Sequence, residues 1–485
     1  MILRVSLPTI RSVARLSIFW LAVGASAHIG SPDVFYEGDA GPYHLFVVVR
    51  VPQAIPGVAE VEVRSASAVL DKVEIVAFRL GGTDAELAPA PQNIEPSKAD
   101  PRSFTGSLWM MESGAMQIRV QVSGAKGKGA LAVPVPAVAL QKLQMSKPLA
   151  ASLFGLLLLL AAGMLSIVMA GAQEATLPPG KIPSVLDRQR ARRVMMGAAC
   201  LLLGVLYLGK RWWNIEDAAA LSRIYKAPPL SARLVDTRLV LDAKSAGHNY
   251  FDDIIPDHGH LMHLFLIREP ALDLFLHLHP EKSSTGEFIA QLPAMPSGHY
   301  KVFDDVVHQS GLPVTMTAEL DLPEISGTKL TGDDSVWSGA SIGGSETTTV
   351  SNLPDGDRIV WEQSKTPLRS GIATLFRFRV EDRNGDPAHD LEPYMGMAGH
   401  AEFVRSDLTV FAHVHPAGSV SMAALDLAQA ELLGESATAQ MAMPVTIGRD
   451  IEFPYGFPKP GTYRIFVQIK RSSQIRTAVF DAHVN

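Results

Sequence analysis

The chain has 485 residues, of which 47% are hydrophobic, and its formal net charge at pH 7 is −6. This length exceeds what one hydrophobic core usually supports, so we expect about three folded units. The charge balance provides no basic surface, which argues against nucleic acid as a partner. No phosphate-binding loop, dinucleotide-binding glycine pattern or nucleophile elbow occurs in a convincing strand–turn–helix context.

Residues 1–27 have the pattern of a secretory signal peptide. Arg11 and Arg15 precede a short apolar run, and Ala-Ser-Ala at 25–27 follows it. A charged start, an apolar middle and small residues at the end are the parts of a cleavable signal. We therefore expect cleavage after Ala27, with an uncleaved anchor as the alternative.

Residues 28–147 are expected to form a β-sandwich. Short β-rich segments such as DKVEIVAFRL and MQIRVQVSG alternate with Gly, Pro and Asp, and helical periodicity is weak. The stretch WMMESGAMQIRVQVSGAKGKGALAVPVPAV resembles the end of the YtkA/FixH-like periplasmic domains, which are small immunoglobulin-like sandwiches often encoded near copper or respiratory-oxidase functions. The resemblance implies a sandwich fold and an association with copper handling, without implying an activity.

Two apolar runs, residues 149–170 and 194–213, are expected to form a transmembrane hairpin. The first is long enough to cross a bilayer core of about 30 Å at about 1.5 Å per residue. Two cations interrupt the second, beside two tryptophans that suit the membrane interface. The intervening loop, residues 171–193, is rich in Arg and belongs on the cytoplasmic side. This topology predicts a bacterial inner-membrane protein with both large parts in the periplasm.

The single cysteine, Cys200, lies inside the second apolar run. The exported parts of this sequence therefore contain no disulfide and no thiolate ligand. That excludes blue-copper centres and structural zinc sites of the cysteine type.

After the hairpin, residues 230–325 and 358–485 are expected to form two further sandwiches, joined by a polar linker at 326–357. They read as an internal repeat, because GHLMHLFLIR…FLHLHP in the first corresponds to GHAEFVR…FAHVHP in the second. The segment from FRFRVEDRNGD to HVHP also resembles a bacterial secreted-protein pattern. The fold class predicted for the whole chain is mainly β: three immunoglobulin-like sandwiches and a two-helix transmembrane hairpin.

Each repeat is predicted to bring three histidines to one face of a hairpin: His263, His277 and His279 in the first, and His400, His413 and His415 in the second. A tip of three residues in the first hairpin and two in the second sets the first histidine of each set opposite the second one. The third lies two residues further on and shares their face. A one-residue change in either register would separate the histidines.

Three neutral imidazoles on a rigid sheet suit Cu(II), Zn(II) or Ni(II). Met395 and Met397 would add thioethers suited to Cu(I), and His258, His260 and Asp257 in PDHGH could join. We expect a membrane-anchored periplasmic metal-binding protein for copper delivery, storage or resistance, with zinc as the other candidate ion and a copper-handling or respiratory membrane protein as partner. The alternative is a non-metal assembly or scaffold protein of a membrane complex, in which the histidines are structural.

A second candidate metal site lies at the front of the exported chain. Cleavage after Ala27 would give His28 a free amine, and with His44 it would form a copper-binding brace. In the alternative interpretation His44 simply packs in a strand. Spacing identifies no catalytic residues, so we do not expect an enzyme; an oxidative copper enzyme built on the brace is the minor alternative.

Overall fold

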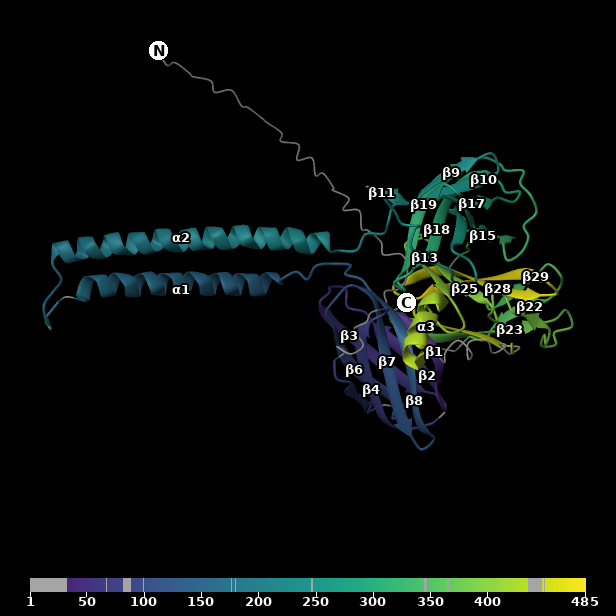
Figure 1. The fold of residues 1–485 in the computed structure, drawn as a ribbon, viewed down its shortest axis with the longest axis horizontal. Helices are drawn as coiled ribbons and strands as arrows, with labels where there is room; N and C mark the ends of the chain where they lie inside the picture. The colour runs from purple at the N-terminus through teal and green to yellow at the C-terminus, as the bar shows by residue number, and fades with distance from the viewer. Residues whose placement is uncertain are drawn as a thin grey trace, which may run out of the picture.

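The computed structural model describes residues 33–485, except positions 67, 82–88, 99, 176, 179, 246, 344–346, 364–365, 435–446 and 449. In this part of the chain, strand-rich regions gather at one end and two long helices extend away from them side by side (Figure 1). We name these regions the front domain (33–140), the first histidine domain (230–343) and the second histidine domain (347–485). The expected signal peptide and His28 lie outside the described residues.

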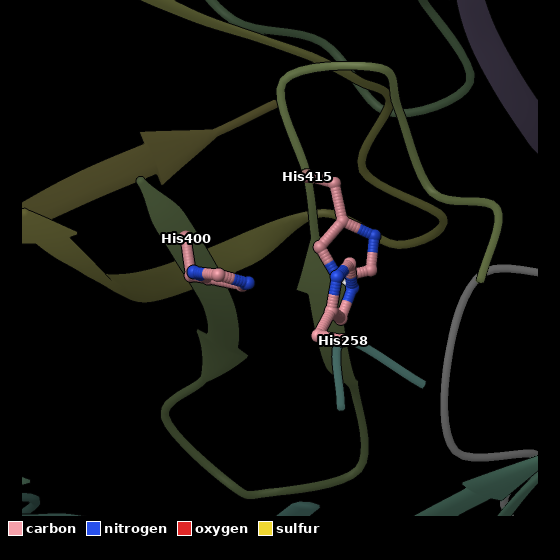
Figure 2. Close-up of side chains that lie close together, drawn as sticks. All are labelled: His258, His400 and His415. Carbon is pink, nitrogen blue, oxygen red and sulfur yellow. Dashed lines mark hydrogen bonds between the residues drawn. The ribbon is translucent and has the colours of Figure 1, made fainter. Parts of the chain in front are cut away.

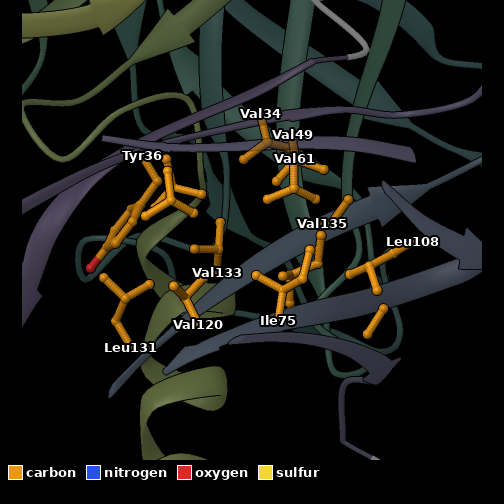
Figure 3. Packing of buried hydrophobic residues seen from close by; sticks show 14 of the residues in the cluster. Val34, Tyr36, Val49, Val61, Ile75, Leu108, Val120, Leu131, Val133 and Val135 are labelled. Carbon is orange, nitrogen blue, oxygen red and sulfur yellow. The ribbon is translucent and has the colours of Figure 1, made fainter. Parts of the chain in front are cut away.

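The front domain is an eight-stranded sheet with the order β1-β2-β3-β6-β5-β4-β7-β8. Alternate residues face inward; in β3, for example, Ala59, Val61 and Val63 are buried. The two halves of the sheet enclose a valine-rich core (Figure 3). The strands are β1 (Val34–Ala40), β2 (Tyr43–Arg50), β3 (Gly57–Ser65), β4 (Leu70–Arg79), β5 (Gln92–Pro96), β6 (Ser103–Met110), β7 (Gly114–Gly124) and β8 (Gly127–Ala137).

Helices α1 (Lys147–Glu174) and α2 (Val185–Ser222) are both long and apolar enough to cross a membrane. Their most apolar windows have mean hydropathies of 2.5 and 1.6. At about 1.5 Å per residue, each exceeds the roughly 30 Å of a hydrocarbon core. No residue of α1 is buried, so packing inside the protein does not account for its apolar side chains.

The α2 helix begins earlier than the expected span, and it includes arginines that we expected in a loop. Ser184 and Asp187 form a capping box that starts the helix. The arginines between 188 and 193 follow within its first turns, because Arg is a good helix former once a cap is in place. The connection between the helices is therefore shorter than residues 171–193.

The first histidine domain contains two main sheets. One has the order β16-β17-β10-β9; the other has the order β13-β18-β14-β15-β20, with β19 also paired to β18. The strands are β9 (Ser231–Val235), β10 (Arg238–Asp242), β11 (Lys244–Ser245), β12 (His248–Asn249), β13 (Ile254–Ile255), β14 (His263–Glu269), β15 (Leu274–Leu278), β16 (Glu281–Lys282), β17 (Phe288–Gln291), β18 (Gly298–His308), β19 (Pro313–Leu322) and β20 (Ser335–Ser338).

The second histidine domain repeats this plan. Its sheets have the orders β21-β22-β23-β27 and β24-β28-β25-β26, with β29 also paired to β28. The elements are β21 (Val350–Asn352), β22 (Arg358–Trp361), β23 (Thr374–Glu381), β24 (Leu391–Glu392), β25 (His400–Arg405), β26 (Phe411–Val414), α3 (Met422–Leu433), β27 (Asp450–Tyr455), β28 (Gly461–Arg471) and β29 (Gln474–Val484).

The segment expected to be a linker, residues 326–357, instead belongs to both histidine domains. Strand β20 pairs with β15 in the first, and β21 pairs with β22 in the second. Some of its polar side chains serve the histidine cluster: Asp334 contacts His279, and Ser335 contacts Gln468. A pattern based on hydrophobic alternation does not detect such short, polar edge strands.

The second histidine domain also packs against the front domain. Helix α3 lies on β8, where Ala424 and Ala428 meet Ala132. At Gly418 the backbone pairs with Tyr36, and a Cβ there would lie 1.9 Å from the carbonyl oxygen of residue 35. The small side chains let the two backbones approach closely, which fixes the position of the second histidine domain.

Candidate metal centre

The two histidine domains meet through equivalent faces of their larger sheets. Phe275 stacks on Phe466 with ring centroids 4.2 Å apart, and Phe411 stacks on Phe303 at 4.3 Å. Phe275 and Phe411 each lie two residues before the HxH motif of their own domain. Each stacked pair is thus the counterpart of the other with the domains exchanged. The interface has approximate two-fold symmetry, as in an isologous dimer.

In the first hairpin the histidines share the predicted face, but the predicted pairing was wrong. Leu264 lies opposite Leu278, a register that sets His263 across from His279 instead of His277. The hairpin tip is therefore two residues longer than expected. Because side chains alternate with a period of two, an even shift leaves every histidine on its predicted face.

The second hairpin shows the same correction. Ala401 pairs with Val414, which sets His400 across from His415 instead of His413. The backbone N–H of Arg405 donates to the carbonyl of residue 410, so four residues form the tip where we expected two. The same two-residue difference in both hairpins supports the internal repeat.

Eight imidazole rings gather beside the stacked phenylalanines. Centroids of neighbouring rings lie between 3.9 and 6.2 Å apart. Within this cluster two groups of three are close enough to hold an ion, because their ligand atoms all lie within 4.8 Å of one another. The first triad is His263, His277 and His279, and the second triad is His258, His400 and His415. The two remaining rings are His260 and His413.

In the first triad, each ring directs one nitrogen outward to a protein oxygen. The partners are the carbonyl of Asp257 for His263 Nε2 at 3.0 Å, Gln468 Oε1 for His277 Nδ1 at 2.7 Å, and Asp334 Oδ1 for His279 Nδ1 at 2.9 Å. A neutral imidazole has one N–H and one lone pair. Donation to these oxygens leaves the lone pairs on His263 Nδ1, His277 Nε2 and His279 Nε2.

The lone pairs of the first triad converge without protons between them. His263 Nδ1 and His277 Nε2 are 3.2 Å apart, and His279 Nε2 is buried with no hydrogen-bond partner among the described residues. The amide of Gln468 is fixed, because its Nε2 donates to Ser335 Oγ at 2.6 Å and so directs Oε1 to His277. Metal-binding histidines commonly show this pattern, with the outer N–H held by an oxygen and the inner nitrogen free.

The second triad joins the two histidine domains. His258 comes from a turn of the first domain, and Figure 2 shows its ring beside that of His415, with His400 directed toward both from a separate strand. The Nε2 atoms of His258 and His415 are 3.0 Å apart, while His415 Nδ1 donates to the carbonyl of Val420 at 3.0 Å. Both ring nitrogens of His400 are buried and have no partner in the described part of the chain.

The turn that carries His258 also exists in the second histidine domain. His258 and Gly259 have φ of 53° and 84°, and Met395 and Gly396 have φ of 49° and 81°. Two successive positive φ values describe the tight turn of a two-residue hairpin. The predicted ligands Met395 and Met397 therefore occupy the positions of His258 and His260, and both methionines are buried.

Burial keeps the rings of both triads and of His413 neutral. It lowers the pKa of His277, His400 and His413 well below the ordinary 6.5, and neighbouring imidazoles lower it further. Burial also raises the pKa of Asp305 to about 7 and that of Glu402 well above 4.5. Both oxygens of Glu402 are buried without a hydrogen-bond partner among the described residues. A bound cation would offset the cost of burying these unpaired imidazole nitrogens and carboxyl groups.

The remaining predicted residues lie elsewhere. His413 borders the cluster but belongs to neither triad; its Nδ1 is 3.6 Å from Asp305 Oδ2. His44 lies in β2 of the front domain, with its ring nitrogens 2.7 Å from Asp39 and 2.8 Å from Glu37. Burial lowers the pKa of His44, but the hydrogen bonds to these two carboxylates outweigh it and raise the pKa overall. The brace with His28 stays a prediction.

Sequence reasoning did not find the oxygens that orient the rings. Asp334 lies in the segment taken for a linker, and Gln468 lies in β28, far from any histidine motif. The repeat offers one signal for Gln468. In the paired strands it aligns with Asp305, and the two residues contact the equivalent histidines, His277 and His413, of the opposite domains.

A family model matches only part of the chain. Residues 351–485, nearly all of the second histidine domain, match the model of a domain of unknown function, DUF8832. No curated protein matches the chain. Similar solved structures include an ICAM-5 D1–D4 ectodomain fragment (8% identity, 92% of this chain and 77% of that chain, TM-score 0.16) and SGBP-B from a xyloglucan utilization locus in Bacteroides uniformis (8%, 93% and 98%, TM-score 0.16). Similarity this weak carries no functional argument.

Proposed function

We propose that this chain is a membrane-anchored, extracytoplasmic metal-binding protein whose two histidine domains hold two transition-metal ions, one on each triad. The observation that carries the proposal is the first triad, in which three outer N–H groups are engaged by oxygens and three lone pairs converge. A purely structural role predicts the opposite arrangement, with every buried ring nitrogen paired to a protein partner. Delivery, storage or resistance are the roles that such a site supports.

Copper is the ion we favour. Imidazole ligands suit both copper and zinc, and divalent copper binds nitrogen ligands more tightly. Met395 stands at the turn position equivalent to His258, so the second histidine domain has a thioether where the first supplies an imidazole ligand. A soft sulfur ligand favours Cu(I). The burial of both triads also supports retention of an ion over rapid exchange with solvent.

The membrane anchor supports a periplasmic site next to a membrane partner. Helices α1 and α2 join the front domain to the first histidine domain, so all three domains lie on one side of the hairpin (Figure 1). The arginines near the start of α2 lie at the end of the hairpin that is far from the domains, and they favour a cytoplasmic position for that end. A copper-handling or respiratory membrane protein is the partner this arrangement suggests.

The test is the metal content of the full chain in detergent. The protein would be stripped with a chelator, loaded with Cu(II) or Zn(II), dialysed and analysed by mass spectrometry. We expect about two copper ions per chain. The variant His279→Gln should lose one ion, because it removes an inner lone pair of the first triad.

The matched control removes histidines outside the cluster. His248 is exposed and the His299 side chain is 40% exposed, and the double variant H248A/H299A should keep both ions. Circular dichroism would establish that every variant is folded. A folded wild-type chain that retains neither copper nor zinc would overturn the proposal and favour the scaffold alternative.

A further inference from the structure

A cavity of about 580 Å³ lies beside the histidine cluster, where all three domains meet. Its lining includes Val138 of the front domain, Ile224 just after α2, Val314 of the first histidine domain and Phe411 of the second. Since α2 ends at Ser222, the cavity adjoins the point where the helical hairpin joins the domains. Its volume falls in the range of small-molecule sites, roughly 300–1,000 Å³.

Most of the lining is apolar. Valines and prolines from the front domain and from β18 and β19 form much of it, together with the ring of Phe411. The apolar part of the lining suits the body of an organic molecule, and the polar part, which includes Lys226, Thr315 and Ser421, suits a polar head.

One group of lining residues is polar and incompletely paired. Asp305 Oδ1, His413 Nε2 and the hydroxyl of Tyr455 are each buried, and none has a hydrogen-bond partner among the described residues. Tyr455 and His413 belong to the second histidine domain, and Asp305 belongs to the first. Buried polar atoms are nearly always paired, so three such atoms around one cavity indicate a missing partner.

The chemistry of the three atoms specifies that partner. The Tyr455 hydroxyl can donate a hydrogen bond, while His413 Nε2 and Asp305 Oδ1 can accept one. A hydroxyl group accepts and donates at once, so it satisfies the tyrosine and one acceptor together. We propose that this cavity binds a small apolar molecule with a hydroxyl head, of the phenol class, with its ring against the valines, prolines and Phe411.

This site is independent of metal binding, because none of the three polar atoms belongs to either triad. The lining nevertheless includes His263 and His415, one from each triad. A bound phenol would therefore lie next to both ions. The histidine that the sequence assigns to a triad, His413, has its function here instead.

The experiment measures binding of 4-butylphenol to the metal-free full chain in detergent by isothermal titration calorimetry. Butylbenzene, which has no hydroxyl, is the matched ligand. We expect it to bind at least tenfold more weakly, because one well-formed hydrogen bond to a buried site corresponds to roughly that factor. Tyr455→Phe should reduce the phenol affinity several-fold. Tyr463→Phe should not, since that hydroxyl donates to the carbonyl of Lys459 and Tyr463 does not line the cavity.

A second pair of variants tests whether the phenol binds in this cavity. Val138→Trp fills the cavity and should abolish binding, whereas Val69→Trp, at an exposed position of the front domain, should leave it unchanged. Equal affinity for butylphenol and butylbenzene would overturn the assignment of the hydroxyl, and unchanged binding in Val138→Trp would overturn the assignment of the cavity. Because the protein is metal-free throughout, neither outcome depends on the proposed metal function.

A third arm identifies the source of the ligand. Dodecylphenol confined to the lipid of a nanodisc reaches the cavity only from the bilayer. Its binding would assign a membrane-borne phenol, while binding of the soluble butylphenol alone would assign a ligand from the aqueous side. Failure of both to bind would overturn the proposal.

Discussion

His263 Nδ1 and His277 Nε2 lie 3.2 Å apart in the core of the domain interface, and the protons of both rings are held on their far sides. Two lone pairs in contact repel each other. The surrounding hydrogen bonds hold both rings in place despite this repulsion. Pre-organised ligands of this kind lower the cost of binding an ion.

The oxygen of Gln468 orients His277 across the domain interface. In Gln468→Leu we expect copper affinity of the first triad to fall by about 10–100-fold, the usual effect of removing such a partner. Competition with a chelator of known affinity measures this change. Gln291→Leu, at an exposed position in β17, is the matched control. An unchanged affinity would mean that Gln468 does not position the ring.

The structure and the sequence pattern assign different histidines to the second triad. The structure groups His258 with His400 and His415, so His258→Ala should lose one of the two ions. His413→Ala should keep both, although the sequence pattern assigned His413 as a ligand. Metal analysis of the two variants decides the matter; the reverse result would favour the triad predicted from the sequence.

Only the second triad takes its ligands from both histidine domains, so it should depend more on their contact. Phe466→Leu removes part of the stack with Phe275 and loosens the interface. We expect copper affinity to fall more at the second triad than at the first. Phe378→Leu, inside the core of the second histidine domain, is the control for general destabilisation. Equal loss at both triads would contradict the assignment.

Stability of the metal-free chain should fall as the pH drops from 7 to 5. Buried histidines with a lowered pKa stay neutral in the folded state, whereas the unfolded chain protonates them below about 6.5. Protons therefore favour unfolding in this window. The histidines concerned are His258, His263, His277, His279, His400, His413 and His415.

Of the carboxyls in the two domains, the three whose pKa is raised most oppose this trend. Burial raises the pKa of Asp304, Asp305 and Glu402, so the folded state holds their protons when the unfolded state has already lost them. Seven histidines against three carboxyls leave a net uptake on unfolding of up to about four protons, each worth about 1.4 kcal/mol per pH unit. Thermal unfolding in detergent at pH 7 and 5 measures the effect. A midpoint that does not fall would show that the rings are not neutral in the folded state.

The sequence by itself determined which face the histidines share. Alternation along a strand places His277 and His279 on one side whatever the tip of the hairpin, and an error of two residues in the register leaves this unchanged. The length of a hydrophobic run is also a local feature, and it predicted helices long enough to cross a membrane. Such features depend on neighbours in the chain, which the sequence displays directly.

Only the tertiary structure decided which histidines form a triad and what orients them. His258 reaches its partners by crossing a domain interface, and Gln468 contacts a ring 191 positions away in the chain. The edge strand β20, which follows Asp334, looks like a linker because its polar residues serve the site and not a hydrophobic core. These contacts depend on how two whole domains pack through their stacked phenylalanines, and packing across an interface leaves no periodic pattern in either segment.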